Sequence, residues 1–535
     1  MNKNLQTVFN YHQTTKHSQQ RYARSLGYMD WQTQPNPFRN YNGTDSLLLP
    51  LALENNTPPY HLLDSELPPA PLLKESLSQL LQFSMGIAAW KVSGDSSWAV
   101  RCNASSGNLH PTESYLILPP TLDEQNEKTT VFHYTPKNHG LESLTAFDTS
   151  FWDTLPKGSF LIGLSGISWR EAWKYGERAF RYVNLDAGHA LQSINVSSKM
   201  LGWKLTPLDS VSDADIATLL GLSQEKRFFE REHADMLFVV SPEEVSTSLS
   251  IETLLQDVPL MFDGIANKLS PTMENWEIIA EVENATSVMQ IAQKDVIKSQ
   301  VLPTATQESK KVIMQRRSIH VMDKVRSPIT KDEFHTLLAG VVDSLNGKEN
   351  AAHLAIFVHR VKEYESGIYI LVRNERDKKA LQEQMFSAFK WKECEFSGLY
   401  LLDVRDSMIA SKTISCAQDI ASDGAFSLGM LCNFSEQLNT YGAHRYKELY
   451  WECGAIGQQL YLDATSMGLS GTGIGCFLDD MMHSVLGLES DKGLNPSASD
   501  ALNAESYKFQ ILYHFTVGRG YVDSRIQTQE AYEER

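Results

Sequence analysis

Residues 441–488 repeat residues 175–222 without a gap, at a constant offset of 266 positions, and ten of the 48 aligned positions are identical. Solenoid and propeller repeats are only roughly 20 to 50 residues long, so this period predicts two whole domains fused in tandem. The expected product is a pseudo-dimer within one chain. Identical pairs include Tyr175 and Tyr441, Gly188 and Gly454, Gln192 and Gln458, Gly202 and Gly468, and Gly221 and Gly487.

The composition is that of a soluble globular protein and narrows the range of partners. The 535 residues suit two domains, and no run of about 18 apolar residues is present that could span a bilayer. The opening residues are polar and lack the apolar segment of a secretory signal, so we expect a cytoplasmic protein with no membrane partner. A net charge of −17 repels nucleic acid, which leaves a small-molecule substrate as the expected partner.

The six cysteines are scattered along the chain without Cys-x-x-Cys spacing. Their distribution argues against a zinc site and against a disulfide framework. We therefore expect no metal at these cysteines and expect most of them to be buried thiols; they are Cys102, Cys394, Cys416, Cys432, Cys453 and Cys476.

Changes in composition divide the chain into four parts. Residues 1–70 are rich in Tyr, Pro, Asn and Arg, and we interpret them as an arm that wraps over the body. Residues 71–284 and 311–535 are the two expected domains, and residues 285–310 are the expected linker. The pattern of apolar residues predicts helices over residues 72–90 and 173–203 and strands over residues 114–118, 236–240 and 510–517.

A polar loop, Ser-Ser-Gly-Asn-Leu-His-Pro-Thr-Glu, lies between a predicted helix and a predicted strand of the first domain. Ser105, Ser106 and Asn108 offer small hydrogen-bonding groups, and Gly107 lets the backbone approach a planar ligand. An ordinary loop of turn residues is the other interpretation of this pattern.

Two motifs of the second domain suit an anion. The first motif combines the guanidinium groups of Arg316 and Arg317 with the hydroxyl group of Ser318. A solvated charged turn has the same composition. Arg519 follows the last predicted strand, where it can reach an anion or simply end the strand.

Two further motifs follow or open the duplicated helices. Gly471, Thr472, Gly473, Ile474 and Gly475 place three alternating glycines where backbone can pack close to a ligand edge, or where a tight helix-to-strand connection is made. The pair Lys174 and Tyr175 can transfer a proton if burial shifts one pKa, whereas most such pairs are surface residues.

In this order along the chain, the motifs resemble the nitroreductase superfamily, and within it the SagB-type dehydrogenases, which include oxidases of azoline rings. The resemblance extends from about Tyr11 to Arg525. It rests on residues 105–113, residues 174–182, residues 316–318, residues 471–476 and residues 517–519, together with residues 22–28 and 34–39 of the opening stretch.

The resemblance implies an α+β fold of two tandem nitroreductase-like domains, each with a central mixed sheet flanked by helices. The domains would form an intrachain pseudo-dimer, and a monomeric chain is then sufficient. It also implies FMN at the interface of the two copies, with hydride transfer through the flavin N5 atom. NAD(P)H is a candidate electron donor.

The two copies have lost complementary parts of this site. The first domain has no clear counterpart of residues 316–318, and it has residues 240–242, Val-Ser-Pro, where the second has residues 517–519, Val-Gly-Arg. The second domain has no Ser-Ser-Gly-Asn loop, and Thr440 replaces Lys174. The sequence therefore predicts one composite FMN site per chain, with the other pseudo-symmetric site defunct.

What the resemblance implies for each residue follows the family's pattern. Phosphate binding falls to Arg316, Ser318 and Arg519, and Arg317 would bind the phosphate or the ribityl chain. The flavin ring would contact Ser105, Ser106 and Asn108, with Gly107 between them, and the backbone of Gly471, Thr472, Gly473, Ile474 and Gly475. Proton transfer would involve Lys174 and Tyr175.

The leading interpretation is an FMN-dependent oxidoreductase acting on a heterocycle or a peptide-derived compound. The first alternative is an NAD(P)H-dependent reductase of nitro compounds or quinones. An alternative of another class is a flavin-binding or interaction protein without turnover.

Overall fold

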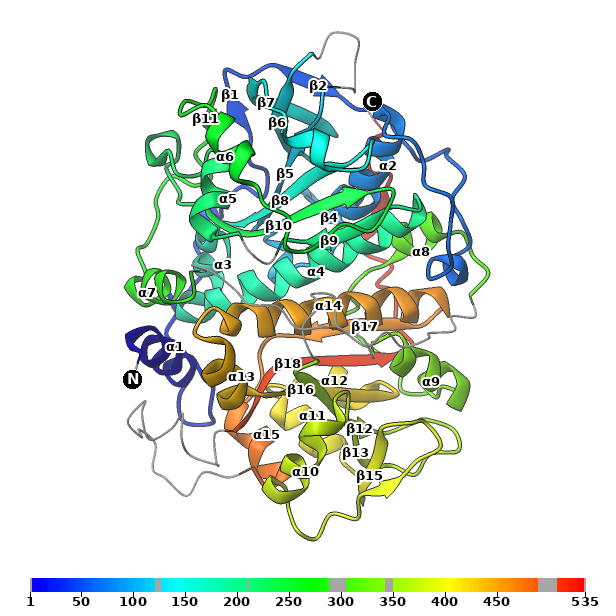
Figure 1. Cartoon of the computed structure of the whole chain (residues 1–535). Helices are drawn as coiled ribbons and strands as arrows, with labels where there is room; N and C mark the ends of the chain where they lie inside the picture. The colour runs from blue at the N-terminus through cyan, green and yellow to red at the C-terminus, as the bar shows by residue number, and fades with distance from the viewer. Residues whose placement is uncertain are drawn as a thin grey trace.

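In the computed structural model, residues 2–120, 127–208, 211–287, 305–341, 350–488 and 508–533 are described. Two seven-stranded sheets occupy opposite ends of the molecule, and two long helices, α4 and α14, lie side by side between them (Figure 1). This arrangement confirms the α+β prediction of two tandem domains, with the interface between the copies formed inside one chain.

The two sheets have the same strand order except for the outer strand, which comes from the opening stretch in the first sheet and from between β13 and β15 in the second. The first runs β2 (Ser46–Leu48), β7 (Gly140–Phe147), β6 (Thr129–Thr135), β5 (Thr112–Leu118), β8 (Phe160–Gly166), β10 (His233–Ser241) and β9 (Lys204–Pro207). The second runs β14 (Lys392–Glu393), β15 (Leu399–Val404), β13 (Gly367–Leu371), β12 (Ala352–Val358), β16 (Phe426–Asn433), β18 (Phe509–Gly518) and β17 (Ser470–Ile474). Strands of both sheets pair antiparallel, and the parallel pairs that the structure describes are isolated bridges, one of which joins Ser318 to Gly471 beside β17.

Helices cover the faces of both sheets. In the first domain they are α2 (Lys74–Ser84), α3 (Ser168–Tyr175), α4 (Ala179–Met200), α5 (Asp213–Leu219), α6 (Glu252–Asp257) and α7 (Glu277–Ala285). In the second they are α9 (Lys331–Ala339), α10 (Glu375–Gln384), α11 (Met408–Ile414), α12 (Ile420–Asp423), α13 (Phe434–Tyr441), α14 (Arg445–Ser466) and α15 (Asp479–Leu486). Helix α8 (Ser309–Gln315) instead packs against α2, β3 and α14.

The strand predictions are confirmed, and both helix predictions are too long. The helix expected over residues 72–90 ends at Ser84. The chain then turns at Gly86, where the backbone lies so close to the Gln82 carbonyl that no Cβ would fit, and continues as strand β3 (Ile87–Ser93). The helix expected over residues 173–203 is interrupted at Gly176, whose φ of +53° suits glycine. Its backbone passes so close to Arg24 that no Cβ would fit.

The seam between α4 and α14 preserves the duplication in its contacts. Gly188 packs against the backbone of Trp451, and its equivalent Gly454 packs against the backbone of Leu185, with no room for a Cβ at either glycine. The identity of this pair in the repeat therefore has a packing cause, the close approach of two helices.

Two ion pairs across the seam are also related by the repeat. Arg181 Nη1 lies 2.8 Å from Asp479 Oδ1, and Lys447 Nζ lies 2.6 Å from Asp213 Oδ2. Positions 181 and 447, and positions 213 and 479, are equivalent under the 266-residue offset. Each domain thus contributes a cation from its long helix and a carboxylate from the helix that follows its edge strand.

Both ends of the chain cross to the opposite domain, as the N and C labels of Figure 1 show. Helix α1 (Lys3–Thr14) leads into residues that bind the second domain, where Lys16 Nζ lies 2.8 Å from Asp480. At the other end, β19 (Gln527–Gln529) pairs with β3, which also pairs with β4 (Ser96–Arg101), and Tyr532 is buried against the first domain. A small two-stranded sheet of β1 (Tyr41–Asn42) and β11 (Ile265–Ala266) completes the fold.

The cysteine pattern gave no indication of a disulfide, but the structure contains one. Cys416 and Cys476 form a disulfide, which ties the loop after β17 to the end of α11. The remaining four are free, with Cys102, Cys432 and Cys453 buried. Spacing along the sequence could not reveal this pair, because its partners are 60 residues apart and meet only in the folded domain.

The described residues contain no group of three or more His, Cys, Asp or Glu side chains placed to hold a metal ion. Among the helices described, none is long and apolar enough to cross a membrane.

Candidate functional site

The Ser-Ser-Gly-Asn loop follows β4 and is held by hydrogen bonds within the first domain. The backbone NH of Ser106 donates to Asp186 Oδ1 at 2.9 Å, and its hydroxyl donates to the same atom at 2.8 Å. Ser105 Oγ accepts from the His110 NH, and Asn108 Nδ2 donates to the Ala99 carbonyl. Gly107 has a φ of +59°, so the loop takes a tight left-handed bend there.

Lys174 and Tyr175 lie directly against this loop. A Cβ placed on Gly107 would stand 2.7 Å from the Tyr175 hydroxyl and 3.1 Å from Lys174 Nζ. The Tyr175 ring packs on Tyr182, with 4.3 Å between centroids, and Tyr182 in turn covers Gly475. The structure therefore brings the predicted loop, the Lys-Tyr pair and the end of the glycine run into one contiguous cluster across the seam.

Two buried carboxyl groups in this cluster were not predicted from the sequence. Burial raises the pKa of Asp186 to about 7, although hydrogen bonds from Ser105 and Ser106 oppose the shift. Burial and the nearby Asp186 raise the pKa of Glu171 well above its usual value, and neither Glu171 oxygen has a hydrogen-bond partner. Groups that titrate near neutral pH can exchange protons with a ligand. The signal in the sequence is the recurrence of Asp186 as Glu452, an acid kept in both copies.

Arg316 lies at the seam and reaches into the first domain. Its Nε donates to the Cys102 carbonyl at 3.1 Å and its Nη2 to the Arg101 carbonyl at 2.7 Å. The guanidinium also lies 5.2 Å above the Tyr461 ring of α14. Gln458 of α14 supports the same strand end, since it accepts from the Ala104 NH and donates to the Cys102 carbonyl. The identity of Gln192 and Gln458 in the repeat could have indicated this role.

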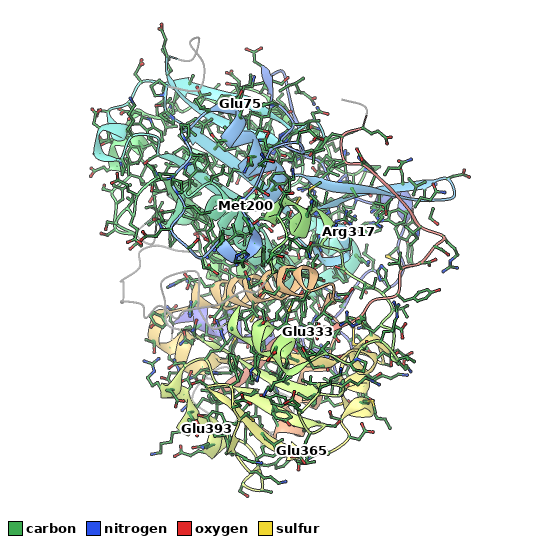
Figure 2. All side chains as sticks on the ribbon, turned by 90° about the vertical axis from the view of Figure 1, so that its right-hand side faces the viewer. Glu75, Met200, Arg317, Glu333, Glu365 and Glu393 are labelled. Atoms are coloured by element: carbon green, nitrogen blue, oxygen red, sulfur yellow. A yellow bond between two sulfur atoms is a disulfide. The ribbon has the colours of Figure 1, made fainter. Side chains whose placement is uncertain are left out.

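Arg317 completes a cationic pair that lacks a counter-charge. It donates to the carbonyls of Met314 and Arg316 and stands beside α14 at the level of the seam (Figure 2). Within the described residues, neither guanidinium forms an ion pair with a carboxylate. Burial lowers the pKa of Arg316, and burial together with Arg316 lowers the pKa of Arg317 to about 10. Burial and Arg317 also lower the pKa of Lys91. Repulsion between neighbouring cations of this kind is relieved when an anion binds between them.

Ser318 connects this cationic pair to the glycine run. Its hydroxyl lies 2.8 Å from the hydroxyl of Tyr461, which accepts a hydrogen bond from the Gly473 NH at 2.8 Å. Thr472 Oγ1 donates to the Ile319 carbonyl and accepts from the Ile319 NH. Ile474 is buried against Met322 and neighbouring apolar side chains on the opposite face of the strand.

The three glycines of this run share one face of β17 and its continuation, and aromatic rings cover that face. Gly471 packs against Phe515 and Tyr461, Gly473 against Tyr513, and Gly475 against Tyr182. A ring of a ligand on this face would have to displace Tyr513 or Tyr182.

Arg519 lies near these residues, but its guanidinium is directed toward α9. Its Nη2 is 3.3 Å from Glu333 Oε1 of α9, and its backbone NH donates to Ser327 Oγ. The guanidinium is therefore already partly neutralised, unlike those of Arg316 and Arg317.

The residues present fit the phosphate of FMN. Two uncompensated guanidiniums and the Ser318 hydroxyl form a donor set suited to a dianion. For the flavin ring, the first domain offers the loop around Gly107, and the second offers β17 with its aromatic cover. The donor set for a phosphate is thus already assembled, whereas protein side chains occupy the face of β17 beside which a flavin ring would lie.

Comparison with known proteins connects this geometry to one family. The model of the nitroreductase family matches residues 66–229 and 313–496, one match in each domain. A protein from Anabaena variabilis, provisionally described as a nitroreductase, is 19% identical and has a TM-score of 0.69, over 96% of this chain and 99% of that chain. No curated protein matches.

Two further solved structures each match less than half of this chain. The E. coli microcin synthetase McbBCD complex with truncated pro-MccB17 bound is 18% identical, with a TM-score of 0.28 over 46% of this chain and 94% of that chain. A nitroreductase with bound FMN from Bacteroides fragilis is 13% identical, with a TM-score of 0.20 over 40% of this chain and 90% of that chain. Of the three likenesses, that to the Anabaena variabilis protein supports the fold, at an identity too low to transfer a ligand.

Proposed function

The chain belongs to the nitroreductase family, and we propose that it is an FMN-dependent oxidoreductase with one composite cofactor site at the seam between its domains. Membership of the family supports an oxidoreductase that uses a flavin. The finer proposal assigns the anion end to the second domain and the ring end chiefly to the first.

The uncompensated pair Arg316 and Arg317 is the observation that supports this proposal most strongly. A buried guanidinium without a carboxylate is unfavourable unless a ligand supplies the negative charge. Arg316 also contacts the carbonyls just before the Ser-Ser-Gly-Asn loop, so a phosphate bound here would lie beside residues of both domains. Ser318 is the third proposed phosphate ligand, and Arg519 a weaker one because Glu333 competes for it.

The groups around Gly107 would bind and orient the ring and move protons. Ser105, Ser106 and Asn108 are the proposed ring contacts, with the backbone of residues 471–475 on the other side. Lys174 and Tyr175 remain the proposed proton-transfer pair, and Asp186 is added because its pKa of about 7 permits either protonation state near neutral pH. Bound FMN would supply hydride transfer at N5.

Two electron routes fit such a site. The first is dehydrogenation of a heterocycle or a peptide-derived substrate, and the second is reduction of nitro compounds or quinones by NAD(P)H. Mixing the FMN-loaded chain with NADPH in the absence of oxygen distinguishes them by the absorbance of oxidised flavin. We expect no bleaching within the time of turnover if the flavin is reduced by its own organic substrate, and rapid bleaching would assign the reductase route instead.

The aromatic cover of the glycine face favours a candidate of another class, a chain that binds the phosphate end of a ligand without turnover. It predicts that FMN binds and that neither dithionite-reduced nor oxidised cofactor exchanges electrons with any added donor or acceptor. Reoxidation of the bound reduced flavin by a quinone would reject this candidate, and a complete failure of exchange would reject the enzyme proposal.

A further inference from the structure

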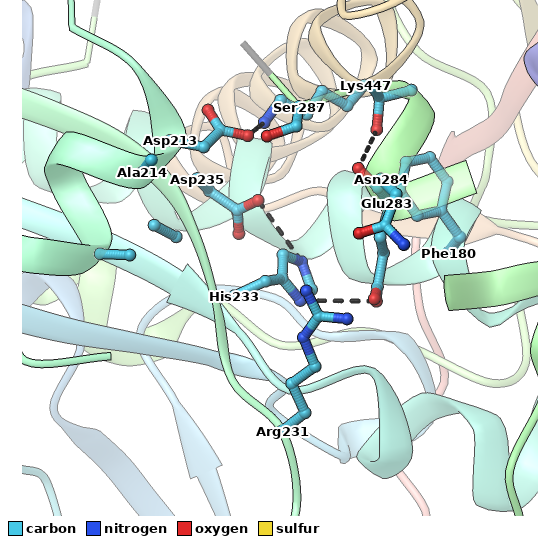
Figure 3. Close-up of a pocket in the computed structure, with 13 residues that line it drawn as sticks. Phe180, Asp213, Ala214, Arg231, His233, Asp235, Glu283, Asn284, Ser287 and Lys447 are labelled. Carbon is cyan, nitrogen blue, oxygen red and sulfur yellow. Dashed lines mark hydrogen bonds and ion pairs between the residues drawn. The ribbon is translucent and has the colours of Figure 1, made fainter. Parts of the chain in front are cut away.

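A second polar cavity lies at the seam beside the first turn of α4, and none of the residues that line it is assigned to the proposed flavin site. It has a volume of about 170 Å³ and is lined by residues of α4, α5, β10, α7 and α14 (Figure 3). A water needs roughly 10 to 15 Å³ of such space, so the cavity can hold a small organic molecule. Phe180 forms an apolar part of the wall, and Lys447 lines it from the second domain.

The wall of this cavity holds more carboxylates than cations that can pair with them. Lys447 is already used, since its Nζ lies 2.6 Å from Asp213. The carboxylates of Asp235 and Glu283 are not paired with Lys447, and His233 lies 3.5 Å from one oxygen of each. Arg231, also on the wall, is exposed. Figure 3 shows His233 between the two carboxylates.

Asp235 is the residue that indicates the binding of a ligand. Its residue is only 4% exposed, and neither carboxylate oxygen has a hydrogen-bond partner in the protein. His233 Nε2 also lacks one, so the 3.5 Å approach does not satisfy the carboxylate. A buried carboxylate without donors is costly, and a ligand that brings donors and a positive charge removes that cost.

The duplication shows what fills the equivalent place in the other half. Positions 180, 213 and 447 of the cavity correspond to Tyr446, Asp479 and Arg181. At that place the segment after α1 is bound, with the His17 NH donating to Asp479 at 2.9 Å and the Lys16 ammonium on Asp480. Ala214 stands where the other half has Asp480, and the unpaired carboxylate comes from Asp235 instead. The equivalent site is therefore filled by a chain segment that carries a primary ammonium group.

We propose that this cavity binds a small primary amine in its ammonium form, with Asp235 as the anchoring carboxylate and Phe180 as the wall for its apolar part. Glu283 adds negative charge without being the main ligand, because its Oε1 already accepts from the Ser168 hydroxyl at 2.5 Å. An aromatic ring beside an ammonium group contributes further attraction.

Titration of the full chain with n-butylammonium, followed calorimetrically at pH 7, tests this proposal. We expect saturable binding of one ligand with a dissociation constant on the order of millimolar, within what so few heavy atoms can provide. Asp235→Asn keeps the shape and removes the charge, so it should weaken binding by about tenfold or more. Glu283→Gln should weaken it less, and Asp257→Asn, an exposed carboxylate outside the cavity, should leave it unchanged.

The neutral 1-butanol serves as a matched probe on the unaltered chain, so the test does not depend on any variant folding. Its affinity should be lower by about tenfold or more if charge is recognised. Absence of n-butylammonium binding, equal binding of 1-butanol, or unchanged binding by a folded Asp235→Asn chain would each overturn the proposal. None of these results depends on whether FMN binds.

Discussion

Replacing Arg316 and Arg317 together with alanine is expected to leave the purified chain without flavin. Each guanidinium offers charge-assisted hydrogen bonds to a phosphate, and such a bond contributes about 1.5 to 3 kcal/mol. Loss of both therefore weakens FMN binding by roughly 10² to 10⁴-fold. The measurement is the ratio of flavin absorbance to protein after gel filtration of the loaded chain.

Two single variants separate this effect from damage to the fold. Arg316 supports the carbonyls of Arg101 and Cys102, so its loss also removes contacts across the seam. Arg317 donates only to nearby carbonyls of its own turn and to Ala88, and Arg317→Ala should keep the thermal midpoint while losing flavin. Arg519→Ala is the matched control, with a smaller loss because Glu333 already binds that guanidinium. Full flavin occupancy in the double variant would refute the phosphate assignment.

Replacing Asp479 with alanine is expected to destabilise the chain by about 3 to 5 kcal/mol. This carboxylate is fully buried between Arg178 and Arg181, with ion-pair distances of 3.2 and 2.8 Å, and it also accepts from the His17 NH. Its removal leaves two buried guanidiniums without a counter-charge. The measurement is the free energy of unfolding in urea at pH 7.

The pseudo-symmetric carboxylate provides the control. Asp213 pairs with Lys447 alone and its side chain is 15% exposed, so Asp213→Ala should cost clearly less than Asp479→Ala. Equal losses would contradict the view that the pairing of Asp479 with Arg178 and Arg181 is stronger than the pairing of Asp213 with Lys447.

The stabilisation by Asp479 also has a predictable pH dependence. Burial by itself would raise its pKa, but Arg178 and Arg181 outweigh burial and hold the pKa well below its usual value of 3.8. A carboxyl group whose pKa is lower in the folded state stabilises fully above the unfolded pKa and loses that contribution as the pH falls toward the folded pKa. The difference between the unaltered chain and Asp479→Ala should therefore be constant near neutral pH and shrink below about pH 4.

The duplication predicted the architecture because the residues that are identical in the two copies act locally, within the paired helices α4 and α14. Gly188 and Gly454 are identical because two backbones meet there, and this needs no knowledge of the rest of the fold. The lengths of the helices were less predictable. The helices end or are interrupted beside Gly86 and Gly176, where close approaches of backbone leave no room for a Cβ, and apolar periodicity continues across both positions.

The candidate site was predictable as a set of motifs but not as a set of contacts. The proximity of Gly107, Lys174 and Tyr175 comes from three segments that meet only after folding. Asp186 was visible as a recurring acid, yet its pKa of about 7 depends on burial that no short motif encodes. The pairing of Arg519 with Glu333 is likewise a tertiary contact between residues 186 positions apart.

The number of flavins bound per chain tests the central claim most directly. After saturation with FMN and removal of the excess, the absorbance of the bound flavin is compared with the concentration of the intact chain. The composite site predicts one FMN per chain, held by Arg316 and Arg317 of one domain beside the Gly107 loop of the other. A ratio of two would show that both pseudo-symmetric sites survive, a ratio of zero would show that neither does, and either result would contradict the account.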